Sequence, residues 1–199
     1  TPVAIAEGAI GNLDLMLEHN MPKSKMHESI ESAHSEVIFL ANMINDLSTL
    51  SRTERGIGDN AEIIDVQKLG ENIFERYKSQ AEKKGLQLDL DLSPDLGKIK
   101  TSRLYIEELL QNFMTNAIKY TKTGNVVINF KNLGDEVCFS IIDSGIGMTK
   151  ADQQKVFDKF FRSEDYRTRE TGGTGLGLYV SRKLAEKMGT KIEVKSRLN

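Results

Sequence analysis

A helix-like segment at residues 112–120 carries two asparagines and a lysine on one helical face. Asn112 and Asn116 are four residues apart and Lys119 follows within one turn, so their side chains lie on the same side of a helix. Amide oxygens are hard neutral ligands that suit Mg²⁺, and a lysine reaches phosphate as a mobile point charge. Because asparagine is mediocre in a helix interior, the pair predicts a metal–phosphate site. Two amides that merely face solvent are the alternative.

A second segment, at 143–148, places a carboxylate and two glycines after a strand-like run. Asp143 ends the run, and Gly145 and Gly147 flank Ile146. The carboxylate can accept a hydrogen bond from an exocyclic amine such as that of adenine, and the glycines let the backbone approach a flat ring. Aspartate and glycine also dominate ordinary turns, so this segment alone is a weak signal.

A third segment, at 172–178, brings a glycine-rich run to the start of a predicted helix. Backbone N–H groups in such an approach form a cradle for anions. The spacing is neither that of a P-loop nor that of a dinucleotide-binding turn. The candidate phosphate-holding residues are Gly173, Thr174, Gly175, Leu176 and Gly177.

Between the two glycine-containing segments lies FDKFFR at 157–162, followed by a charged run at 163–171. Aromatic anchors before a polar segment are typical of a lid that closes over a ligand. Arg162 can supply charge to a transferring phosphoryl group. A plain surface loop is the alternative. In this order, the segments at 112–120, 143–148 and 172–178 together predict an ATP pocket that has no P-loop.

The elements that would position these residues follow a glycine-containing linker at 55–60. Strands are expected at 63–66, 86–92, 125–131, 136–143 and 190–196, and helices at 67–84, 102–120 and 174–188. Helices on one face of a mixed sheet make an α+β layered domain. A hydroxyl of Thr101 or Ser102 is expected to cap the helix that carries Asn112.

Residues 1–56 show no strand pattern and are expected to form a helical hairpin. The first helix is expected at 2–18, Pro22 interrupts it, and the second is expected at 24–53. A heptad seam runs along the second helix through Met26, Ile30, Ala33, Val37, Leu40, Ile44 and Leu47. Because this seam is longer than the first helix can cover, we predict a four-helix bundle made from two chains. Packing of the hairpin on its own C-terminal domain is the alternative.

The composition excludes several classes of protein. With 39% hydrophobic and 28% charged residues, the 199-residue chain is typical of a globular protein. A net charge of −2 gives no electrostatic case for nucleic acid or for an acidic membrane surface. The single cysteine, Cys138, cannot form an internal disulfide and is expected to be a small core residue. No bilayer-spanning run or signal peptide is visible, and the chain begins at Thr-Pro without Met. We therefore expect a cytoplasmic fragment of a longer protein, with any membrane anchor upstream.

These segments together resemble the cytoplasmic core of a two-component sensor histidine kinase, a class of bacterial signal transduction. Residues 112–120 are similar to the family's N-box, 143–147 to its G1 box, 157–162 to its F-box and 173–178 to its G2 box. Residues 30–56 resemble its second dimerisation helix. The resemblance extends over nearly the whole chain.

The resemblance implies a dimerisation and phosphotransfer hairpin at 1–56 and a Bergerat-type ATP-binding domain, an α/β two-layer sandwich, at 61–199. The implied reaction transfers the γ-phosphoryl group of ATP to a histidine and then to an aspartate on the receiver domain of a response regulator. The implied cofactors are ATP and Mg²⁺, and the implied assembly is a homodimer joined through the N-terminal helices. Dephosphorylation of the regulator is a further activity of the family.

The resemblance also implies a role for each candidate residue. Mg²⁺ is assigned to Asn116 with Asn112 beside it, phosphates to Lys119 and Arg162, and the adenine pocket to Tyr120 and Asp143. The loops that enclose the nucleotide are the G1 residues Gly145, Ile146 and Gly147 and the G2 residues from Gly173 to Gly177.

The family's phosphoacceptor box has the form His-Glu-x-x-Thr-Pro, whereas this chain begins at Thr1. The phosphoacceptor is therefore expected four residues upstream of Thr1, outside this sequence. Thr1 matches the threonine that assists dephosphorylation of the regulator. His19, His27 and His34 lie in no such box and are not expected to accept the phosphoryl group. The family's last strand is expected to be missing as well.

Two other functions stay open. An ATP hydrolase of the gyrase, Hsp90 and MutL type uses the same pocket and carries a glutamate four residues before the first N-box asparagine, where this chain has Glu108. A dimer module that senses nucleotide without catalysis is the other alternative.

Overall fold

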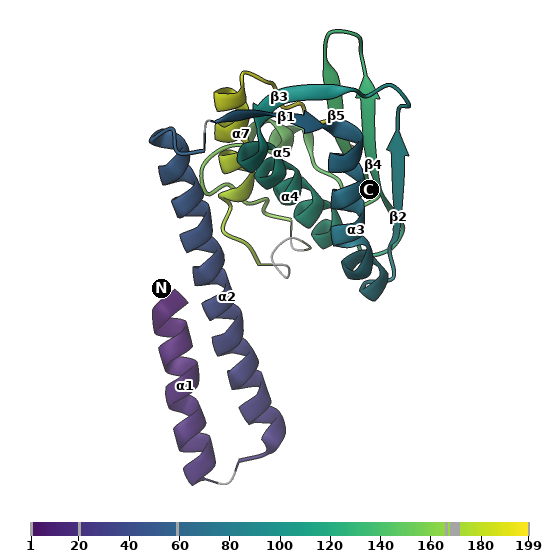
Figure 1. Ribbon diagram of the computed structural model, residues 1–199. Helices are drawn as coiled ribbons and strands as arrows, with labels where there is room; N and C mark the ends of the chain where they lie inside the picture. The colour runs from purple at the N-terminus through teal and green to yellow at the C-terminus, as the bar shows by residue number, and fades with distance from the viewer. Residues whose placement is uncertain (1, 20, 59, 166, 168–171, 199) are drawn as a thin grey trace. The chain divides into compact units, whose positions relative to one another are not determined.

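The computed structural model describes residues 2–19, 21–58, 60–165, 167 and 172–198 (Figure 1). Its helices are α1 (Pro2–Glu18), α2 (Lys23–Glu54), α3 (Val66–Lys83), α4 (Arg103–Tyr120), α5 (Lys150–Lys155) and α7 (Gly177–Met188). Its strands are β1 (Ala61–Asp65), β2 (Gln87–Leu92), β3 (Lys98–Ser102), β4 (Asn125–Asn132) and β5 (Val137–Asp143). None of the helices in these described ranges has both the length and the apolar character that crossing a bilayer requires.

The chain divides into two compact units. The first unit comprises Thr1–Thr49 together with Gly172–Thr174, and the second comprises Leu50–Thr171 together with Gly175–Asn199. The boundary at the N-terminal side therefore lies within α2. The domain limits predicted from the sequence, at 56 and 61, stay a prediction.

In the first unit, α1 and α2 form the predicted antiparallel hairpin (Figure 1). Among the described residues of this unit, the buried apolar side chains are small: Ala6, Ala9 and Ala33. Several large apolar residues of both helices are exposed: Ile5, Ile10, Leu17, Ile30, Val37, Ile44 and Leu47. A single hairpin therefore leaves most of the predicted heptad seam open to solvent.

The second unit contains two sheets. Strands β1 and β3 form an antiparallel pair in which Ile64 lies opposite Ile99. The larger sheet has the order β2-β4-β5, with β2 and β4 parallel and β4 and β5 antiparallel. Its register aligns Leu90, Ile128 and Ile141 across the three strands.

The core of this unit lies between the larger sheet and the helices α3 and α4, with α7 packed against α4 (Figure 1). On β4, Val126, Ile128 and Phe130 alternate along one face and are completely buried. Leu110 and Met114 of α4, four residues apart, are completely buried as well. This arrangement of helices on a mixed sheet confirms the predicted α+β class.

The start of α4 is tied to the linker after α2. The Ser102 hydroxyl caps α4 by accepting a bond from the Tyr105 N–H (3.2 Å). It also donates to the Gly58 carbonyl (2.6 Å), and the Tyr105 hydroxyl donates to the Ile57 carbonyl (3.1 Å). The hydroxyl cap predicted from the sequence is confirmed, and this part of the linker is anchored to the domain.

The structure corrects four expectations. Residues 190–196 are not a strand, and the helix expected from residue 174 begins at Gly177. The short elements β3 and α5 were not predicted. Cys138 is exposed, because β5 directs its neighbours Val137 and Phe139 toward the core and Cys138 to the opposite face.

Candidate nucleotide-binding site

The N-box helix α4 meets the G2 box at the start of α7. The Asn112 amide donates to the Gly177 carbonyl (3.4 Å). A Cβ on Gly177 would lie 3.5 Å from Asn112 Oδ1. Asn112, Asn116, Lys119 and Tyr120 are all half-buried on α4. The predicted metal and phosphate residues therefore lie on a helix that contacts the end of the glycine-rich segment.

The G1 box folds onto the other end of α4. The Ile146 N–H donates to the Tyr120 carbonyl (3.3 Å). A Cβ on Gly145 would lie 2.6 Å from the same carbonyl oxygen, so only glycine fits there. The exposed Asp143 carboxylate accepts a bond from the Gly145 N–H (2.9 Å), which fixes its direction at the end of β5. The loop that carries the candidate adenine-binding Asp143 thus contacts the backbone of the candidate adenine-lining Tyr120.

The F-box meets the G2 box as well. Gly175 has φ of 70°, and a Cβ there would lie 2.8 Å from the Phe160 carbonyl carbon and 2.9 Å from the Phe161 oxygen. Phe160 itself has φ of 64° and an exposed ring, a conformation that a bulky residue adopts only under constraint. Arg162 follows Phe161 directly and has an exposed side chain.

The N-terminus of α7 suits an anion. Leu176, its N-cap residue, is buried, and no side chain caps the helix there. The first N–H groups of a helix lack intrahelical partners and carry the positive end of its dipole. Gly177 opens the helix and Gly175 precedes it, so the backbone can come close to a phosphate chain.

The predicted G2 residues are divided between the two compact units. Gly173 and Thr174 belong to the first unit, whereas Gly175, Leu176 and Gly177 belong to the second. The Thr174 hydroxyl donates to the Asp46 carboxylate (2.6 Å). Burial raises the pKa of Asp46, and this hydrogen bond lowers it by a smaller amount.

The remaining residues named in the sequence analysis lie in the G1 box and in the helical hairpin. Gly147 has φ of 68°, and a Cβ there would overlap the Arg197 carbonyl, so the G1 box requires glycine at this position. Thr1 lies outside the described residues. His19 closes α1 with a bond to the Leu15 carbonyl (2.9 Å), and His27 pairs with Glu31 on α2 (3.4 Å).

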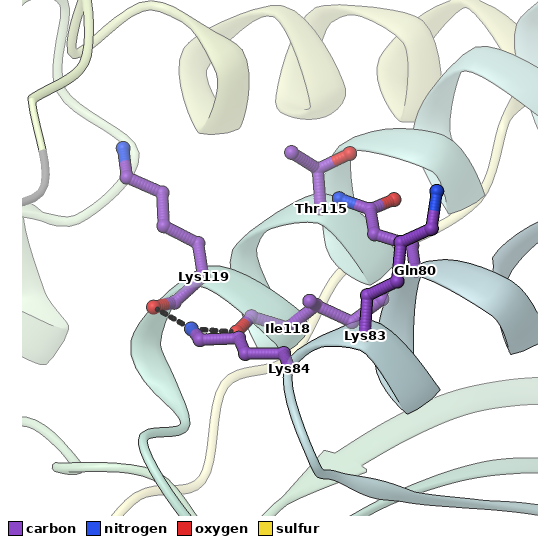
Figure 2. Close-up of a pocket in the computed structure, with 6 residues that line it drawn as sticks. All are labelled: Gln80, Lys83, Lys84, Thr115, Ile118 and Lys119. Atoms are coloured by element: carbon purple, nitrogen blue, oxygen red, sulfur yellow. Dashed lines mark hydrogen bonds between the residues drawn. The ribbon is translucent and has the colours of Figure 1, made fainter.

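A pocket of about 430 Å³ lies between α3 and α4 (Figure 2). Its lining residues are Gln80, Lys83, Lys84, Thr115, Ile118 and Lys119. Lys119 alone among them was a predicted site residue, and no sequence motif indicated that α3 lines this side of α4. Figure 2 shows that Lys84 differs from the other two lysines, because its ammonium bonds to the backbone of α4.

These residues fit a magnesium-bound nucleotide. Asn112 and Asn116 supply amide oxygens and Lys119 an ammonium group on α4. Asp143 supplies a carboxylate that is oriented by the Gly145 N–H, and the start of α7, which follows Gly175, has no side-chain cap. At Gly145 and Gly175 a Cβ would lie less than 3.0 Å from backbone atoms of neighbouring segments, so both loops pack closely only because these residues are glycine. The arrangement is typical of phosphate and purine binding without a P-loop.

Comparison with known proteins agrees with this geometry. Residues 101–199 match the family described as histidine kinase-, DNA gyrase B- and HSP90-like ATPase. The histidine protein kinase SaeS of Staphylococcus epidermidis is 29% identical over 178 residues, which cover 88% of this chain and 51% of the relative. The chain therefore spans about half the length of that relative.

Two solved structures share the fold. The histidine kinase AdeS of Acinetobacter baumannii has a TM-score of 0.69 at 24% identity, covering 94% of this chain and 84% of its own. Full-length ShkA, solved in complex with AMPPNP, has a TM-score of 0.68 at 23% identity, covering 95% of this chain and 42% of its own. Residues 101–199 thus form a domain of the histidine kinase-, DNA gyrase B- and HSP90-like ATPase family, and histidine kinases are among the relatives and solved structures that the whole chain resembles.

Proposed function

We propose that this chain binds Mg-ATP and directs its γ-phosphoryl group to a histidine upstream of Thr1, and from there to a receiver-domain aspartate of a response regulator. In the first step the bond from phosphorus to the bridging oxygen of ADP breaks and a bond to the histidine nitrogen forms, so ADP leaves. The observation that carries the proposal is the meeting of α4 with the G2 box at Asn112 and with the G1 box at Tyr120.

Different residues are proposed to bind the phosphates and the adenine base of the nucleotide. Asn116 and Asn112 would hold Mg²⁺, which when bound neutralises charge on the phosphates. Lys119 and Arg162 would contact the phosphates, and Asp143 would accept a bond from the adenine amine. ShkA, which shares the fold, was solved in complex with AMPPNP, and this supports an adenine nucleotide as the ligand.

We further propose that the N-terminal hairpins of two chains form a four-helix bundle. The exposed seam on α2, with Ile30, Val37, Ile44 and Leu47, is the kind of apolar stripe that packs against another helix pair. We propose that Thr1, which matches the threonine of the family's phosphoacceptor box, assists dephosphorylation of the regulator.

The phosphotransfer test uses a chain extended upstream through the phosphoacceptor box and ATP labelled at the γ-phosphate. Phosphohistidine is acid-labile and base-stable, so we expect label with those properties on the extended chain. We expect Glu108→Gln to retain it. Absence of label, together with steady ATP hydrolysis that Glu108→Gln abolishes, would instead establish a hydrolase, and nucleotide binding without either reaction would establish a sensing module.

Asn116→Ala tests the metal assignment. We expect its affinity for ATP in Mg²⁺ to fall to the affinity that the unaltered protein shows in EDTA, because the proposed metal ligand is gone. Titration calorimetry with a non-hydrolysable ATP analogue measures both. An Mg²⁺-dependent affinity equal to that of the unaltered protein would show that Asn116 is not a ligand.

Asp143→Asn tests the adenine contact. The amide oxygen can still accept from the Gly145 N–H, so the loop should persist, but the charged acceptor is lost. We expect the preference for ATP over GTP to fall about tenfold, the size of a charge-assisted hydrogen bond. Asp135→Asn, an equal charge change at an exposed hairpin turn, should leave the preference unchanged. Equal losses for both nucleotides in Asp143→Asn would contradict the assignment.

A further inference from the structure

One lysine outside the four sequence motifs joins two helices of the ATP-binding domain. The backbone of Lys84 ends α3: its N–H bonds to the Ala81 and Glu82 carbonyls, and Gly85 follows in the left-handed conformation. Its side chain reaches α4, where the ammonium donates to the carbonyls of Ile118 (2.5 Å) and Lys119 (2.8 Å). Figure 2 shows both bonds.

These bonds complete the C-terminal end of α4. The last four carbonyls of a helix have no intrahelical partner. In α4 the Ala117 carbonyl accepts from Thr121, and the Tyr120 carbonyl accepts from the Ile146 N–H of the G1 box. The two carbonyls between them are the two that Lys84 binds. A cation at this terminus also opposes the negative end of the helix dipole.

We propose that Lys84 is a positioning residue of the nucleotide site, which fixes the last turn of α4 so that Lys119 is held toward the phosphates. The proposal rests on the proposed function, because it takes Lys119 as the phosphate contact. The Tyr120 carbonyl accepts a bond from the Ile146 N–H and does not depend on Lys84. Loss of the Lys84 bonds should therefore displace Lys119 more than it displaces Tyr120, the candidate adenine contact. Lys84 therefore acts on phosphate binding through Lys119 and not by touching the nucleotide.

The pair of neighbouring lysines supplies a matched comparison. Lys83 and Lys84 are both exposed, equal in charge and length, and both line the same pocket. Only Lys84 is observed with its ammonium on the α4 carbonyls in this pocket (Figure 2). Its pKa is lowered, first by burial and then by the charge of Lys122.

The experiment measures the affinities of ATP and adenosine, with Mg²⁺, by calorimetry for Lys84→Met and Lys83→Met. We expect Lys84→Met to bind ATP about tenfold more weakly, the lower range for loss of a group that orients a ligand-binding residue. Its affinity for adenosine should stay within about twofold, and Lys83→Met should match the unaltered protein for both ligands. Lys84→Arg, which keeps the charge and the donors, should recover most of the ATP affinity.

A double-mutant cycle identifies the route of the effect. In a Lys119→Met background, Lys84→Met should cost no further ATP affinity, because the residue it positions is already gone. Equal losses in both backgrounds, an equal loss for adenosine, or no recovery by Lys84→Arg would each overturn the proposal. ATP binding by the unaltered protein is measured alongside: its absence would refute the proposed function, whereas intact binding with an unaffected Lys84→Met would refute this inference alone.

Discussion

The helical hairpin and the ATP-binding domain bury their apolar residues to different degrees. In the domain, Leu110, Met114 and Phe130 are completely buried between helices and a sheet. In the hairpin, large side chains such as Ile44 (62% exposed) and Leu17 (62% exposed) lie in solvent, and the buried apolar residues described up to Thr49 are alanines. One region therefore completes a core within the single chain, and the other does not.

The difference shows where the free energy of folding comes from in each region. Burial of a whole leucine or isoleucine contributes about 1.5–3 kcal/mol, so the domain gains stability from its own contacts. Two helices that leave their large apolar residues exposed gain little, and helices in water depend on such packing for most of their stability. We therefore expect the stability of the domain to be independent of protein concentration and that of the hairpin to depend on it.

The largest expected effect is in the core of the domain. Leu110→Ala should lower the free energy of unfolding by about 2–5 kcal/mol, because it removes buried methyl groups and leaves a cavity between α4 and the sheet. Urea unfolding followed by circular dichroism measures this at two protein concentrations, which should agree. Leu104→Ala, on the same helix at a side chain 43% exposed, should cost less than about 1 kcal/mol. Equal costs at the two sites would show that the core described here does not carry the stability.

A second prediction concerns the seam of the hairpin. Ile44→Glu should weaken dimerisation by about 100-fold or more, because the bundle would bury an unpaired charge at that position. Sedimentation equilibrium measures the change, and calorimetry should show ATP binding by the domain unaltered. Asn42→Glu adds the same charge to an exposed position on the other side of α2 and should change dimerisation by no more than about threefold. A dimer that tolerates both substitutions would remove the seam from the interface.

Local patterns in the sequence were enough to predict most of the helices and strands. The alternation in β2 and the hydroxyl of Ser102 before α4 are signals contained within a few neighbouring residues. The same alternation at 190–196 predicted a strand that the structure does not form, because a ladder requires a partner and the pattern describes only one side of it. In β5, the alternation of side chains directs Phe139 toward the core and Cys138 to the opposite face. The prediction of Cys138 as a core residue did not take this alternation into account.

The candidate site, like the fold, contains residues that local sequence motifs predict and residues that they do not. The motifs predict candidate nucleotide contacts, since each motif is a continuous segment, and these contacts stay a prediction. The role of Lys84 had no signal, because lysine before a glycine is ordinary at a helix end and its partners, Ile118 and Lys119, are 34 and 35 residues away. The same holds for Phe160, which has a positive φ and lies against Gly175, 15 residues further along the chain.

The smallest expected effect is purely local and should be the same whether or not the hairpins associate. Arg167 donates three side-chain bonds and a backbone bond to the Asp165 carboxylate, which lower the pKa of Asp165 to about 2. A depressed pKa means that the stabilising contribution is complete above the ordinary value of 3.8 and is lost as the pH falls through about 2. Carboxyl NMR should show this midpoint in the unaltered protein and in Ile44→Glu alike. In Arg167→Gln it should move up toward 3.8. A midpoint that shifts with Ile44→Glu would mean that this segment depends on association of the hairpins, and the separation of the two regions argued above would fail.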